Sequence, residues 1–144
     1  MEKLSLLMLT VIGFLALSKI AGAQNTIVID VTKIQSQKGD IYIQVHNASQ
    51  NFPKGKPSFQ TILKCNGKDK ISASFKGVEN GLYAISAFQD INGNGIFDKN
   101  LIGIPKEPYA LSNNFHPKMS APSFEDCKVT VNAAKTSFEL QLIN

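Results

Sequence analysis

Seven segments of the chain alternate apolar and polar residues with a period of two, and this pattern limits the possible folds more than any other feature. Successive side chains of a β-strand point to opposite faces, so each segment predicts a strand with one buried face. Gly, Asn and Pro separate the segments, and no amphipathic helix is expected. The sequence therefore predicts an all-β, antiparallel sandwich of about seven strands with one long ordered loop. The predicted strands are residues 27–32, 41–46, 59–65, 71–75, 82–88, 129–131 and 138–142.

Two of these segments carry further expectations. Asn66-Gly67 directly follows residues 59–65 and is a typical hairpin turn, so we expect that segment to pair with residues 71–75. Residues 82–88 are denser in apolar side chains than the others. This density is typical of a central strand buried on both faces.

The N-terminus has the pattern of an export signal. An apolar run at residues 4–17 is followed by Ala21-Gly22-Ala23, a small-residue cleavage pattern. We expect residues 1–23 to be a signal peptide and residues 24–144 to form a single periplasmic or secreted domain, with no transmembrane segment after cleavage. An uncleaved anchor is the alternative.

The chain has two cysteines, Cys65 and Cys127. An oxidising compartment permits a disulfide between them. Such a bridge would stabilise the fold by roughly 4 kcal/mol in the chain-entropy account. Two buried and inert thiols are the alternative.

The formal charge is +4, yet all fifteen basic residues are lysine. Arginine supplies the bidentate contacts to phosphate and guanine that nucleic-acid interfaces use. Its absence argues against a nucleic-acid partner. We expect an unidentified protein or glycan of the cell envelope as the partner instead.

The segment between Phe88 and Lys128 is long, and it is rich in Pro and Gly. Long connections without secondary structure are uncommon in compact domains unless they are functional. This segment is therefore where we expect the chemistry of the protein to lie.

A D-x-N-x-N-G-x-x-D motif opens this segment at residues 90–98. Its alternate positions supply hard oxygen ligands of the kind that Ca²⁺ prefers, with glycine at the sixth position, where a tight turn around the ion is needed. The motif predicts a calcium site. Its expected ligands are Asp90, Asn92, Asn94, the main-chain carbonyl of Ile96, and Asp98.

The twelfth position of the motif is Leu101, where an EF-hand has a bidentate Glu. Glu107 could fold back as the last ligand, or water could complete the shell. With two carboxylates in the loop, the expected Kd is about 10⁻⁴–10⁻³ M. The alternative is a metal-free turn that is held by hydrogen bonds from Asn and Asp side chains to the main chain.

Three motifs resemble a known family. The first is S-F-K-G-V-E-N-G-L-Y-A-I at residues 74–85, which resembles a strand–turn–strand of prealbumin-like and carboxypeptidase-regulatory-like sandwiches. With D-I-N-G-N-G-I-F-D at 90–98 and G-I-P-K-E-P-Y-A-L-S-N-N at 103–114, the chain resembles the bacterial exported family called domain of unknown function 2141. The resemblance implies an Ig-like or prealbumin-like sandwich and export, but no reaction. The family pattern has His and Gly where this chain has Gln89 and Ala110, and the loop also resembles the calcium loops of adhesin B-type repeats.

We expect a non-catalytic module in which calcium orders the long segment. The ordered segment would present Tyr109, Ser112, Asn113 and Asn114 to the partner. The alternative is a calcium-assisted envelope hydrolase that uses Glu107 or His116 as its base. His46 and His116 are both expected to be surface residues without partners.

Overall fold

The structure is a computed structural model, and it describes residues 24–35, 38–47 and 51–144. The predicted signal peptide, residues 1–23, lies outside the described residues. Short strands dominate the chain, with one 3₁₀ turn, η1 (Ser112–Asn114), and one short helix, α1 (Phe124–Cys127). The strands are β1 (Asn25–Thr32), β2 (Asp40–Asn47), β3 (Phe59–Lys64), β4 (Ile71–Val78), β5 (Gly81–Asp90), β6 (Tyr109–Leu111), β7 (Lys128–Val131) and β8 (Lys135–Gln141).

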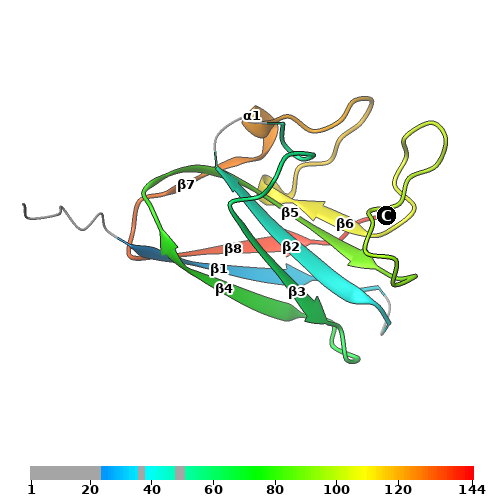
Figure 1. Ribbon diagram of the computed structural model, residues 1–144, viewed down its shortest axis with the longest axis horizontal. Coiled ribbons are helices and arrows are strands. Elements are labelled where there is room, and N and C mark those ends of the chain that lie inside the picture. The colour runs from blue at the N-terminus through cyan, green and yellow to red at the C-terminus, as the bar shows by residue number, and fades with distance from the viewer. Residues whose placement is uncertain (1–23, 36–37, 48–50) are drawn as a thin grey trace, which may run out of the picture.

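The strands form two sheets that face each other (Figure 1). One sheet has the order β4-β1-β8, and the other has the order β3-β2-β5-β6, with β7 also paired to β5. Among the described residues, every strand pair is antiparallel except β1 with β8, which run parallel. The all-β sandwich is therefore confirmed.

Alternating side chains from both sheets fill the space between them. Ile27, Ile29 and Val31 of β1 are fully buried, as are Ile41, Ile43 and Val45 of β2. At about 25 cal/mol per Å² of buried apolar surface, this layer is the main source of folding free energy. The prediction that residues 82–88 form a strand buried on both faces is confirmed for the middle of β5, where Ala84 and Ile85 both have no exposed surface, but not at Leu82, which is 46% exposed.

The predicted hairpin at Asn66-Gly67 is wrong. β3 pairs with β2 and β4 pairs with β1, so this turn carries the chain from one sheet to the other. A tight turn with both residues at positive φ serves either connection, because the turn geometry does not specify the partner strand.

A second, smaller apolar cluster covers the outer face of the β5 sheet. It contains Ala84, Leu111, Phe124 and Cys127, with Phe52 packed against them. His46 of β2 is buried here: its ring meets the edge of Phe52, with centroids 5.2 Å apart. The expectation of a surface His46 is therefore wrong, because the outer face of its strand is covered. His116 is exposed, as expected.

Cys65 and Cys127 are free thiols, so the structure has no bridge between them. Cys65 belongs to the core between the sheets and Cys127 to the cluster on the outer face. Burial raises the pKa of both thiols, and with the Asp126 carboxylate it raises the pKa of Cys127 to about 12. Both cysteines therefore fill apolar space as buried thiols, the usual role of a structural cysteine.

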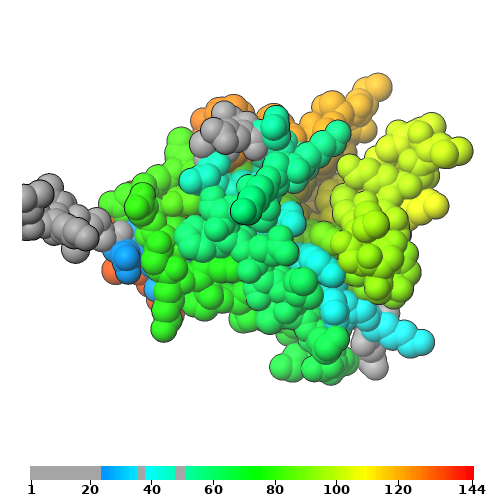
Figure 2. Space-filling model, viewed as in Figure 1, coloured from blue at the N-terminus to red at the C-terminus, as the bar shows by residue number. Residues whose placement is uncertain are grey.

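The long segment after β5 projects from one end of the sandwich, opposite the start of β1 (Figures 1 and 2). Gly39, directly before β2, lies against the start of this segment. No helix in the described ranges is long and apolar enough to cross a membrane.

Candidate metal-binding loop

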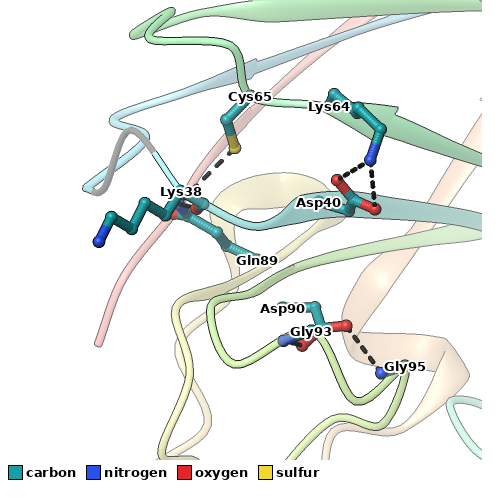
Figure 3. Close-up of polar contacts among 8 residues, drawn as sticks. All are labelled: Lys38, Asp40, Lys64, Cys65, Gln89, Asp90, Gly93 and Gly95. Atoms are coloured by element: carbon teal, nitrogen blue, oxygen red, sulfur yellow. Dashed lines mark hydrogen bonds and ion pairs between the residues drawn. The ribbon is translucent and has the colours of Figure 1, made fainter.

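Asp90 is the last residue of β5, and its side chain points away from the sandwich core. Its neighbour Gln89 faces the other side, where its Nε2 donates to the main-chain oxygen of Lys38 at 3.0 Å (Figure 3). The Gln89 amide also lies 3.7 Å from the Cys65 sulfur. Gln89 thus ties the end of β5 to Lys38, just before β2.

The Asp90 carboxylate is buried and forms the centre of the loop (Figure 3). Its Oδ1 accepts the N–H groups of Gly93 at 2.8 Å and Asn94 at 3.2 Å. Its Oδ2 accepts the N–H of Gly95 at 2.7 Å. Gly93 and Gly95 both have φ near +75°, a conformation that glycine adopts without strain, and this lets the main chain wrap around the carboxylate.

Three side chains of the motif converge at the open side of the loop. The Asp98 Oδ2 accepts the Nδ2 groups of Asn92 at 2.7 Å and Asn94 at 2.9 Å. The Oδ1 atoms of the two amides accept main-chain N–H groups two residues further on, at Asn94 and Ile96. These are the hydrogen bonds of the metal-free turn, and they bring three of the predicted ligand residues together with the amide nitrogens, not the amide oxygens, facing Asp98.

Glu107 lies next to the loop, as expected, and its side chain is buried. Its Oε1 accepts the N–H of Ile91 at 3.1 Å, and its Oε2 accepts the N–H of Asp98 at 3.2 Å. The side chain therefore joins the first and last parts of the loop like a clamp. Sequence reasoning placed Glu107 in the site, but it did not foresee this structural role.

Phe97 anchors the loop to the outer face of the sheet. Its ring lies between Phe88 of β5, with centroids 5.3 Å apart, and Tyr109 of β6, at 5.8 Å. Phe88 in turn stacks on Tyr42 at 4.6 Å. Offset and tilted ring pairs of this kind each contribute about 0.5–1.5 kcal/mol beyond their buried area.

The described residues contain no group of three His, Cys, Asp or Glu side chains that is compact enough to hold a metal ion. A cation in this loop would depend on the amide oxygens of Asn92 and Asn94 together with Asp90 and Asp98. An oxygen-only donor set suits Ca²⁺. To fit it, the two amides have to turn so that Oδ1 replaces Nδ2 on the side of Asp98.

Three of the residues expected to face a partner, Ser112, Asn113 and Asn114, make hydrogen bonds within the fold, and Asn113 is also exposed. Ser112 is buried: its hydroxyl accepts the N–H of Ile85 at 2.9 Å and contacts the main-chain oxygens of Ile85 and Cys127. Asn113 donates to the main-chain oxygen of Lys128 at 3.1 Å, and Asn114 accepts the N–H of Gln141 at 2.9 Å.

The Ser-Asn-Asn motif therefore links η1 to three strands. Asn113 and Asn114 have φ values of +62° and +47°, and asparagine tolerates this left-handed region better than most residues. Tyr109 is half-buried under Phe97. This local geometry accounts for the motif without a partner.

The fold and the loop together define the class of protein: a two-sheet β-sandwich that carries a hydrogen-bonded Asp/Asn/Gly loop at one end. Residues 29–139 match the family described as uncharacterized protein conserved in bacteria (DUF2141), and the chain belongs to this family. The family resemblance seen in the sequence is thus confirmed. Neither the curated proteins nor the solved structures contain a significant match.

Proposed function

We propose that the protein is an exported, non-catalytic module of the cell envelope whose Asp90–Asp98 loop binds one calcium ion. The observation that carries the proposal is the convergence of Asn92 and Asn94 on the Asp98 carboxylate. The two amide side chains already meet the Asp98 carboxylate on the open side of the loop, and once both amides turn, their Oδ1 atoms would join Asp98 as oxygen donors.

The charge of the region also favours a cation. Asp90 and Glu107 are buried carboxylates, and Asp98 is half-buried. The three ion pairs of the described chain join other residues, at Asp40, Asp30 and Glu125. Buried carboxylates are stabilised when a positive charge compensates them, and here only N–H dipoles do so.

Each loop residue has a distinct part in the proposal. Asp90, Asn92, Asn94, Asp98 and the Ile96 carbonyl would hold the ion, with Glu107 either as a sixth ligand or as the clamp seen here. In this proposal the bound ion supplies a fixed positive charge that orders the loop, and it takes part in no chemical reaction. The clamp, the Phe97 anchor and the Asp90 hydrogen bonds would position the ligands before binding.

The alternative proposal is a calcium-assisted hydrolase with Glu107 or His116 as its base. A general base must reach a substrate proton. Glu107 is buried with both oxygens on main-chain amides, and His116 is exposed on a separate part of the segment. These placements favour the non-catalytic proposal.

Thermal unfolding with calcium, magnesium or a chelator tests calcium binding. At a calcium concentration about tenfold above Kd, linkage predicts a stabilisation of about 1.4 kcal/mol and a rise in Tm of about 2–6 °C. Magnesium should have less effect, because it demands a stricter octahedral shell. Asp98→Asn should remove the rise, whereas Asp69→Asn, in an exposed turn, should retain it. Equal Tm values in calcium and chelator would refute calcium binding.

A further inference from the structure

Residues 99–106, here called the finger, form a projecting turn beyond the loop and expose large aliphatic side chains. Leu101 is fully exposed, Ile102 is 81% exposed and Ile104 is 54% exposed. Single exposed apolar residues are common on protein surfaces, but three within four positions form a patch that calls for a partner. Turn tips normally carry Gly, Asn, Asp or Ser.

The finger is ordered by its own hydrogen bonds. The Asn100 N–H donates to the Ile104 oxygen at 2.8 Å, and the Lys106 N–H donates to the Asp98 oxygen at 2.9 Å. The Asn100 side chain accepts the N–H groups of Ile102 and Ile104 at 3.1 and 2.9 Å. The aliphatic tip is therefore held away from the core by a defined turn.

The charges of the finger have one sign. Lys99 and Lys106 are its only charged residues, and both are exposed. They line one shallow depression of about 470 Å³ together with Leu101 and Ile102, so the cationic and aliphatic groups share a face. The nearest acids in sequence, Asp98 and Glu107, accept hydrogen bonds within the loop.

We propose that the finger inserts its aliphatic tip into the surface of a membrane that contains anionic lipids, with Lys99 and Lys106 at the phosphate groups. Leu and Ile are among the residues most favourably transferred into a bilayer, and lysine near the surface is attracted by anionic lipid. The segment projects from one end of the molecule in Figure 2, where it can reach a lipid surface. A protein partner is disfavoured because the finger lacks the Trp, Tyr and Arg that dominate protein interfaces.

This inference does not rest on calcium binding, because the hydrogen bonds of the finger involve none of the proposed ligand atoms. The test is therefore made in chelator, so that its failure and the failure of calcium binding are separate results. The chain contains no tryptophan, which allows a local probe. Full-length Ile102→Trp is mixed with phosphatidylcholine vesicles with and without phosphatidylglycerol, and emission and quenching by brominated lipid are measured.

The matched control is Ile62→Trp, at a residue of β3 that is 47% exposed and outside the finger. Because both variants share the same N-terminus, binding through residues 4–17 would not distinguish them. Ile102→Trp should shift to the blue and be quenched by brominated lipid in the anionic vesicles, and Ile62→Trp should do neither. Circular dichroism and melting confirm that both variants fold.

The lysine contribution is measured in the Ile102→Trp background. Changing Lys99 and Lys106 to Gln should reduce the local insertion constant roughly 30-fold, since each lysine near an anionic surface contributes about fivefold. An unshifted Ile102→Trp spectrum, or equal quenching at positions 62 and 102, would overturn the proposal. So would an insertion constant that is insensitive to both lysines.

Discussion

The Cα of Gly39 packs against the main-chain carbonyl of Asp90, so the turn before β2 directly supports the start of the loop. A Cβ at position 39 would lie 2.1 Å from the Asp90 oxygen and 2.8 Å from its carbon. Gly39 also has a φ of +88°, which side chains rarely allow. The position of the loop relative to the sandwich therefore depends on a glycine 51 residues before Asp90 in the chain.

Gly39→Ala is expected to lower the free energy of unfolding by about 2–5 kcal/mol, because it adds a main-chain clash to the strain of a positive φ. Gly77→Ala is the matched control: its φ is +77° and its Cβ would meet nothing within 4 Å. The control should lose only about 1–2 kcal/mol. Urea unfolding measures both, and equal losses would contradict the close contact.

Ser112→Ala is expected to destabilise the protein by about 1–3 kcal/mol, because it leaves the buried N–H of Ile85 without its acceptor. Ser137 of β8 is exposed and provides the control, where the change should stay within about 0.5 kcal/mol. A Ser112→Ala variant as stable as the control would show that the motif is not a structural link.

His46 predicts a loss of stability at mildly acidic pH. Burial lowers the pKa of His46 from its ordinary value of 6.5, and its Nε2 has no hydrogen-bond partner in the described part of the chain. The unfolded chain therefore binds this proton at a higher pH than the folded protein does. Stability should fall as the pH drops below about 6.5, and the fall should level off below the folded pKa.

The check is urea unfolding between neutral and mildly acidic pH. His46→Leu should remove this part of the pH dependence, and His116→Gln, at an exposed residue, should retain it. If His46→Leu retains this pH dependence and His116→Gln removes it, His46 is not the group whose protonation destabilises the fold.

Glu107→Gln separates the two roles proposed for this residue. If Glu107 is a clamp, the amide group opposes an N–H donor at Ile91 or Asp98, and stability falls by about 1–3 kcal/mol in chelator. If Glu107 is chiefly a ligand, the loss appears only in calcium. We expect the loss in chelator, measured by urea unfolding of the variant and the native chain in parallel.

The strand pattern was readable from the sequence because burial in a sandwich is local and alternates residue by residue. The alternation predicted that the side chains of Ile27, Ile29 and Val31 face the core, and all three are fully buried. Strand partners were not readable, since the Asn66-Gly67 turn suits a hairpin and a sheet crossing equally. β6 was missed because its three residues are too few to show a period.

The loop motif was also readable, because its Asp, Asn and Gly spacing fixes local hydrogen bonds. The buried state of His46 was not, since it depends on Phe52 and α1 packing over the outer face of the sheet. The role of Ser112 likewise depends on β5 and on Cys127, which are distant in the sequence. Contacts between distant segments leave no periodic signal.

Isothermal titration of the protein with calcium tests the central proposal most directly. The account predicts one saturable site with a Kd of about 10⁻⁴–10⁻³ M. It also predicts at least tenfold weaker binding for Asp98→Asn and no change for Asp69→Asn. The absence of a saturable heat, or equal binding by the native chain and Asp98→Asn, would contradict it and leave the loop as a turn held by its own hydrogen bonds.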